Sequence, residues 1–194
     1  GRAGMGVAAE RVLTPAVLAR SRILASGRPR ALLLVPEEAR LDFEDIGGGA
    51  DPQWVVVGDL GTGFTFERLN EAFLALRQGA RLLALHKNPF WRDGEAGLKL
   101  DAGAFVAGLE FAAQVRAEVV GKPAAAFFGL ALELLRLPAQ RVLVVGDDVD
   151  NDGRGAAAVG CRTALVRTGK FAASAGASDF LPDFVLASVA ELSI

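Results

Sequence analysis

The chain has 194 residues, of which 52% are hydrophobic and 23% are charged. This composition is typical of one ordinary domain or two small ones and excludes an intrinsically disordered chain. With 21 basic and 23 acidic residues, the formal charge is -2, so we expect no nucleic-acid partner.

Cysteine and histidine are too scarce for several kinds of site. Cys161 is the only cysteine, which excludes an internal disulfide and a multi-cysteine zinc site and favours a cytoplasmic location. His86 is the only histidine and the chain has no tyrosine, so catalysis must depend mainly on carboxylates, lysines and hydroxyls. No apolar run reaches about 18 residues, the length that a membrane span needs, and we expect no membrane partner.

Short apolar runs alternate along the chain with longer segments of helical periodicity, which predicts an α/β fold with a mostly parallel sheet. The expected helices are 15–25, 66–78, 103–113, 124–135 and 155–159. The expected strands are 31–35, 54–57, 81–85 and 141–145, with weaker candidates at 118–120 and 163–166. Thr14 is the predicted N-cap of the first helix, and Pro15 occupies its first position.

A polar, glycine-containing loop at residues 88–99 interrupts this alternation. Its length and composition are typical of a domain boundary or of a loop that faces a substrate. We therefore expect two units, residues 10–100 and residues 101–194.

Four aspartates follow the expected strand 141–145 within six residues. They are Asp147, Asp148, Asp150 and Asp152. Four carboxylates this close together repel one another. The repulsion is tolerated at the carboxyl edge of a parallel sheet when a divalent cation lies among the oxygens, so the loop predicts a Mg²⁺ site. The alternative is a solvated acidic turn that caps the next helix. An EF-hand is excluded because Val159 occupies the twelfth loop position, where a glutamate is required.

Lys122 lies in a second candidate segment, Val119-Val120-Gly121-Lys122-Pro123. If the strand before it neighbours the strand 141–145, its ammonium stands at the same sheet edge as Asp147. A cation beside a metal–carboxylate cluster suits a phosphoryl group, whose oxygens need neutralisation on both sides. On its own, Lys122 would be interpreted as a surface lysine. A dinucleotide site near residues 59–66 is disfavoured because the third glycine is absent.

Together these motifs resemble the haloacid dehalogenase (HAD) superfamily of phosphatases, in its branch with a large α/β cap. The resemblance covers nearly the whole chain and rests on GKP at 121–123, FF at 127–128, VVGDD with Asp152 at 144–152, and LVRTGKF at 165–171. It implies a cap domain at residues 10–100, inserted in a Rossmann-like core of which residues 101–194 form the C-terminal part.

The resemblance also implies a mechanism, namely Mg²⁺-dependent hydrolysis of a phosphate ester or phosphoamide through an aspartyl-phosphate. In this pattern the catalytic residues are Lys122 and Asp147. The metal-binding residues are Asp147, Asp148 and Asp152, and Lys122 also binds the transferred phosphoryl group.

The cap loop at residues 86–91 is expected to close over a small phosphorylated substrate, which His86, Lys87 and Asn88 would bind. For the apolar pair Phe90 and Trp91 the alternative is an ordinary anchor between cap and core. The cap is also expected to support a homodimer.

The family's first motif, an apolar strand ending in Asp-x-Asp that supplies the nucleophile, is not found in this chain. About sixty residues of the family pattern are missing, so we expect an incomplete core and an inactive chain when it is alone. Three explanations remain open. The sequence is a fragment of a longer phosphatase, or a partner completes the core, or the protein has kept the cap and lost the reaction. The alternative function is a non-catalytic module that dimerises through its cap.

Overall fold

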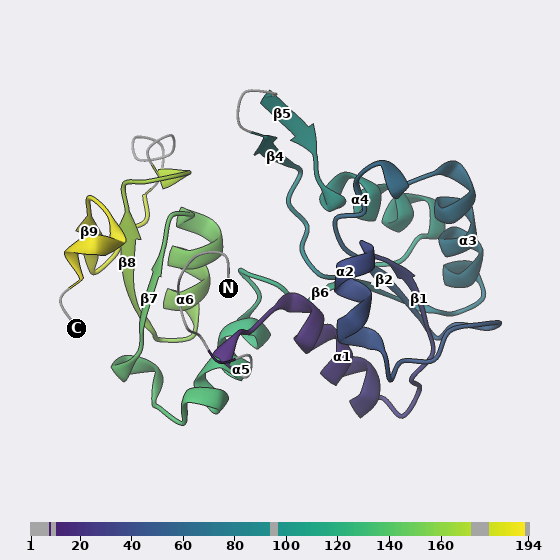
Figure 1. Cartoon of the computed structure of the whole chain (residues 1–194), viewed down its shortest axis with the longest axis horizontal. Helices are drawn as coiled ribbons and strands as arrows, with labels where there is room; N and C mark the ends of the chain where they lie inside the picture. Colours follow the sequence, from purple (N-terminus) through teal and green to yellow (C-terminus); the bar gives the residue numbers. More distant parts are fainter. Residues whose placement is uncertain (1–7, 9–10, 94–96, 172–178, 193–194) are drawn as a thin grey trace. The chain divides into compact units, whose positions relative to one another are not determined.

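A computed structural model of the chain describes residues 8, 11–93, 97–171 and 179–192 (Figure 1). The chain divides into two compact units, Gly1–Gly121 and Lys122–Ile194. This division comes after Gly121, whereas the sequence analysis placed a boundary after residue 100. Among the described residues, no helix is long and apolar enough to cross a membrane.

The first unit contains a parallel four-stranded sheet in the order β1-β2-β3-β6. Its strands are β1 (Ala31–Leu34), β2 (Trp54–Val57), β3 (Arg81–Ala84) and β6 (Glu118–Val119). Every residue of β2 is buried, because a central parallel strand is covered on both faces and is therefore apolar throughout.

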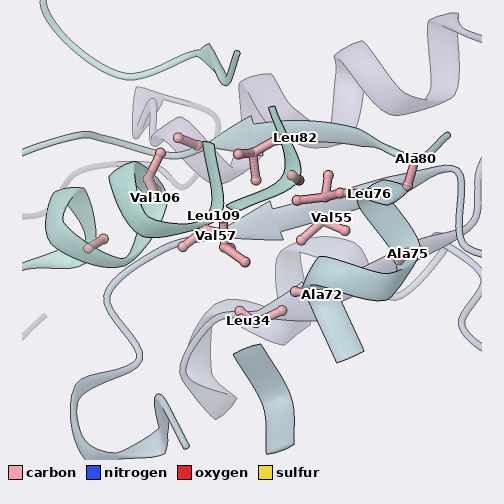
Figure 2. Packing of buried hydrophobic residues seen from close by; sticks show 13 residues of the cluster. Leu34, Val55, Val57, Ala72, Ala75, Leu76, Ala80, Leu82, Val106 and Leu109 are labelled. Atoms are coloured by element: carbon pink, nitrogen blue, oxygen red, sulfur yellow. The ribbon is translucent and has the colours of Figure 1, made fainter. Parts of the chain in front are cut away.

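Helices α3 (Phe66–Arg77) and α4 (Ala102–Ala113) cover one face of this sheet, and their apolar residues pack with those of β2 and β3 (Figure 2). Thr65 caps α3 by accepting a hydrogen bond from the amide of Arg68, and Asp101 caps α4. The segment from α4 to β6 thus belongs to the first unit, although the sequence analysis placed it in the second.

Helix α1 (Pro15–Ala25) has the predicted bounds and the predicted cap, in which Thr14 Oγ1 accepts a hydrogen bond from the amide of Val17. Ser26, directly after α1, accepts a hydrogen bond from the indole of the buried Trp54. Short helical segments described in this unit include α2 (Glu37–Arg40) and two 3₁₀ turns, Leu41–Phe43 and Gly61–Gly63.

The segment predicted as a polar loop contains an antiparallel hairpin of β4 (Phe90–Asp93) and β5 (Gly97–Leu100). Trp91 pairs with Lys99, whose ammonium lies 5.4 Å from the centre of the indole ring. The polar and glycine residues concealed this hairpin in the sequence, because its strands are only four residues long and β4 has no apolar alternation.

The second unit has a parallel sheet in the order β7-β8-β9, with helices and turns between the strands. The elements described in it are α5 (Ala125–Leu135), the 3₁₀ turn Ala139–Arg141, β7 (Leu143–Gly146), the π-helical turn Val149–Arg154, α6 (Gly155–Ala158), β8 (Arg162–Val166), β9 (Phe184–Leu186) and the 3₁₀ turn Val189–Glu191. Phe128, Ala156 and Cys161 form a buried cluster. Within the described sheet β7 lies at an edge, and Leu143 is 37% exposed.

The α/β class and the helices and strands that the sequence predicted are confirmed, with small shifts at their ends. One premise of the sequence analysis is wrong. The strands before Lys122 and before Asp147 belong to different sheets, because β6 pairs with β3 in the first unit and β7 pairs with β8 in the second.

Candidate active site

Lys122 nevertheless contacts the acidic loop. Lys122 is the first residue of the second unit, and the acidic loop belongs to the same unit. The Nζ atom of Lys122 donates a hydrogen bond to Oδ1 of Asp152 over 2.6 Å. Asp152 is only 6% exposed, and its Oδ2 accepts a second hydrogen bond, of 3.1 Å, from the amide of Asp148. Both oxygens of Asp152 are therefore engaged inside the protein.

Two glycines allow this close approach. A Cβ atom on Gly146, the last residue of β7, would lie 2.2 Å from Oδ2 of Asp152. A Cβ atom on Gly155, the first residue of α6, would lie 2.7 Å from the ring of Phe128 and 3.0 Å from Cα of Pro123. Glycine at these two positions lets the acidic loop pack against the segment that carries Lys122.

Asp148 caps the π-helical turn. Its Oδ1 accepts hydrogen bonds from the amides of Asp150 (3.1 Å) and Asn151 (2.9 Å), and its Oδ2 accepts one from Lys170 Nζ (2.9 Å). Burial raises the pKa of Asp148, but the hydrogen bonds from Asn151 and Lys170 outweigh it, so this pKa lies below its ordinary value. The capping role that the sequence analysis gave as the alternative is thus present at Asp148.

Lys170 is a site residue that the sequence analysis did not select. The hydrogen bond to Asp148 raises the pKa of Lys170; burial opposes the rise, and the charges of Asp148, Asp147 and Asp152 add to it. The signal that could have indicated Lys170 is the string LVRTGKF at residues 165–171, which supported the family resemblance but was given no functional role.

Asp147 differs from the other carboxylates of the loop. Asp152 pairs with Lys122, Asp148 with Lys170, and the exposed Asp150 with Arg154. The Oδ2 atom of Asp147 accepts a hydrogen bond from the amide of Lys170 (2.9 Å), and no described residue donates to its Oδ1. Over the described ranges, Asp147 is the one carboxylate of this loop without an ammonium or guanidinium within ion-pair distance.

One carboxylate of the acidic loop, that of Asp147, is suited to bind Mg²⁺. In the part of the chain that the structure describes, no group of three or more His, Cys, Asp or Glu residues is arranged to hold a metal ion. Mg²⁺ does not require such a group, because it is commonly bound by one or two carboxylates together with water and substrate phosphates. Asp147, half-buried and with Oδ1 unengaged by described residues, has the required oxygen chemistry.

The predicted substrate-binding residues lie between β3 and β4 in the first unit, where they connect to α4. His86 Nδ1 is buried, 3.6 Å from Oδ1 of Asp101. The ammonium of Lys87 donates to Oε2 of Glu110 (2.6 Å), and the carbonyl of Asn88 accepts from the amide of Gly103 (3.0 Å). These contacts position the segment within its own unit, and the predicted substrate contacts remain predictions.

Comparison with known proteins shows which proteins the chain resembles. A model of the HAD-hydrolase-like family matches residues 119–192. Phospholysine phosphohistidine inorganic pyrophosphate phosphatase of Xenopus laevis is 37% identical over 172 residues, which are 88% of this chain and 63% of that protein. The chain is therefore similar to proteins of the haloacid dehalogenase superfamily, and residues 119–192 match the family model. It spans less than two thirds of the length of this curated relative.

Solved structures of HAD phosphatases share the fold. A thermostable NPPase double mutant from Geobacillus stearothermophilus has a TM-score of 0.87 at 24% identity, covering 99% of this chain and 77% of that one. Glycerol phosphate phosphatase of Mycobacterium tuberculosis, solved in complex with magnesium, has a TM-score of 0.80 at 30% identity, covering 95% of this chain and 58% of that one. The HAD family match includes Lys122, Asp147, Asp152 and Lys170 but not His86.

Proposed function

We propose that this chain belongs to a Mg²⁺-dependent phosphatase that hydrolyses a phosphate ester or phosphoamide through an aspartyl-phosphate. The observation that carries the proposal is the pairing of Lys122 with the buried Asp152, five residues after Asp147 on the same loop. A lysine held in this way presents a fixed positive charge at the loop that carries Asp147, a carboxylate for which no described residue supplies an ion-pair partner. The relatives and neighbours with this fold are HAD phosphatases.

Each residue has a distinct role in this proposal. Lys122 binds the transferred phosphoryl group, and Asp152 positions Lys122. Asp147 holds Mg²⁺, which supplies positive charge to the phosphoryl oxygens when it is bound. Asp148 maintains the fold of the loop, since its oxygens accept hydrogen bonds from the π-helical turn and from Lys170.

The nucleophile in this proposal is a carboxylate outside this chain. Each carboxylate of the acidic loop already has another role, and Asp150 is exposed and paired with Arg154. Strand β7 lies at an edge of the described sheet, so a further parallel strand that pairs with it would end beside Asp147. A carboxylate at that end attacks phosphorus as the bond to the leaving oxygen or nitrogen breaks and the leaving group takes a proton. Water then releases phosphate and restores the carboxylate.

The substrate in this proposal is a small phosphorylated molecule. The name of the Xenopus laevis relative includes phospholysine, phosphohistidine and inorganic pyrophosphate, which supports phosphorus–nitrogen and phosphorus–oxygen bonds as targets. His86, Lys87 and Asn88 remain the proposed contacts for the rest of the substrate.

An aryl phosphate assay with and without Mg²⁺ tests the function. We expect no turnover by the chain alone and Mg²⁺-dependent turnover after a strand that ends in Asp-x-Asp has been added at its N-terminus. In the active protein, Lys122→Met should abolish turnover, whereas Arg141→Met, a change at an exposed residue of the same unit, should not. Turnover by the chain alone that Asp147→Asn abolishes would show that the nucleophile lies within these residues.

The second candidate is a non-catalytic module that forms a homodimer through the first unit. A groove of about 300 Å³ between α3 and α4 is lined almost entirely by apolar side chains, including Phe66, Phe73 and Phe105. Phe66 is 77% exposed at this groove, and burial in a second copy would remove its apolar surface from water. Sedimentation should show a dimer that Phe66→Ser weakens. A monomer at every concentration would reject this candidate.

A further inference from the structure

A turn after β8 lies directly against Asp147. The amide of Lys170 donates a hydrogen bond of 2.9 Å to Oδ2 of this carboxylate. Gly169 has a φ of +69°, and a Cβ atom at this position would lie 2.0 Å from the same oxygen. The turn therefore requires glycine for two reasons, its left-handed backbone and its contact with the carboxylate.

The side chain of Lys170 holds the same turn on the neighbouring aspartate. Its ammonium lies 2.9 Å from Oδ2 of Asp148, whose side chain is 19% exposed. One residue thus contacts two successive aspartates, Asp147 through its backbone and Asp148 through its side chain. The amide holds Asp147, and the ammonium ties the turn that carries this amide to Asp148, so Asp147 has little freedom to rotate away from its observed orientation.

We propose that the Gly169–Lys170 turn is the positioning element of Asp147 in cation binding. The amide holds Oδ2, which leaves Oδ1 for the cation. This inference rests on the proposed function, in which Asp147 is the Mg²⁺ ligand, and it adds a requirement for a segment 22 residues further along the chain. Partners that orient a ligating side chain commonly change metal affinity by about 10- to 100-fold when they are removed.

The decisive variant is Gly169→Ala, which places a methyl group 2.0 Å from Asp147 Oδ2. Gly160→Ala is the matched control, because Gly160 also has a positive φ, +83°, but a Cβ atom there would meet only Ala139 and Gln140 at 3.7 Å. Both variants introduce the same kind of backbone strain, and only Gly169→Ala displaces the carboxylate. A third variant, Lys170→Met, keeps the amide donor and removes the ammonium from Asp148.

Mn²⁺ titration of the full chain, followed by broadening of its backbone amide NMR signals, measures the affinity without any catalysis. In the unchanged chain we expect broadening around Asp147 and Lys170. Gly169→Ala should bind Mn²⁺ at least about 10-fold more weakly, Gly160→Ala should bind it within about twofold of the unchanged chain, and Lys170→Met should lie between them. Dispersed spectra without Mn²⁺ establish that each variant is folded.

Equal Mn²⁺ affinity of Gly169→Ala and the unchanged chain, or an equal loss in Gly160→Ala, would overturn the positioning role while leaving the metal site in place. Failure of the proposed function gives a different result. In that case the unchanged chain shows no broadening near Asp147, or Asp147→Asn leaves the broadening as it was, and the metal assignment falls together with the positioning role.

Discussion

The ammonium of Lys122 lies 2.6 Å from Oδ1 of Asp152, a carboxylate whose other oxygen accepts the amide of Asp148. The lysine is 42% exposed in its side chain, whereas the aspartate is 9% exposed. The buried Asp152 thus fixes the position of the exposed Lys122. Removal of the Lys122 ammonium leaves the buried carboxylate of Asp152 without its cation, whereas removal of an exposed cation elsewhere leaves no buried charge unpaired.

Lys122→Met should therefore reduce the free energy of unfolding, because Asp152 keeps its charge and loses its cation. A reduction of about 1–3 kcal/mol is expected for an unsatisfied buried acceptor. Urea unfolding measures it, with Arg141→Met as the control, for which a change within about 0.5 kcal/mol is expected. Equal stabilities of the two variants would contradict the pairing.

Gly146→Ala should be destabilising because its methyl group would lie 2.2 Å from Oδ2 of Asp152 and would displace that side chain. The expected cost is about 1–3 kcal/mol, as for other overpacked interiors. Gly129→Ala in α5 is the control. It meets no atom within 4 Å, so we expect a gain of about 0.5–1 kcal/mol from the better helix former. Thermal unfolding of the two variants should move in opposite directions.

Leu109→Ala tests whether α4 belongs to the core of the first unit. Leu109 is 4% exposed and packs in the cluster that joins α3, α4 and the sheet. Its truncation should cost about 2–5 kcal/mol. Phe111→Ala, on the same helix but 81% exposed, should change stability by less than about 0.5 kcal/mol. Similar costs for both variants would show that α4 packs through another face.

Glu110 should make the stability of the first unit depend on acid pH. Burial raises the pKa of Glu110, but hydrogen bonds from Lys87 and the amide of Ala117 outweigh it, so this pKa lies below the ordinary 4.5. The ionised carboxylate therefore stabilises the fold above about pH 4.5, and this contribution is lost as the pH falls through the folded-state pKa.

Glu110→Gln should accordingly reduce the free energy of unfolding by about 1 kcal/mol at neutral pH, and by less at acid pH. The expected reduction is modest because the ammonium of Lys87 is partly exposed to solvent. Urea unfolding at several pH values measures this difference, and the exposed Glu71→Gln on α3 is the control. A difference that stays constant across the pH range would show that charge at Glu110 contributes nothing.

The sequence predicted those elements whose apolar pattern is strong or whose ends carry clear capping residues. Helix α1 has its predicted bounds because Thr14 and Pro15 define its start. Strand β2 was clear because a run of Trp and Val fits a fully buried central strand. The meeting of Lys122 with the acidic loop was predicted correctly from an incorrect premise, because GKP leads directly into α5 and requires no pairing of the strands before the two motifs.

Features that depend on contacts between distant residues were not predictable from local pattern. The hairpin of β4 and β5 depends on pairing between two short strands, and strand β9 depends on its neighbour β8. The division after Gly121 follows from the packing of α4 against α3, which apolar periodicity alone does not reveal. The roles of Gly169 and Lys170 become visible only when the turn lies against Asp147.

Internal counter-ions have a practical consequence for handling the protein. Because Asp152, Asp148 and Asp150 of the loop pair with Lys122, Lys170 and Arg154, we expect the loop to reach its native shape without dissolved metal. In zinc fingers, by contrast, chelators cause denaturation. Purification in EDTA should therefore leave this chain folded, so that metal-free material can serve directly as the starting point for titrations.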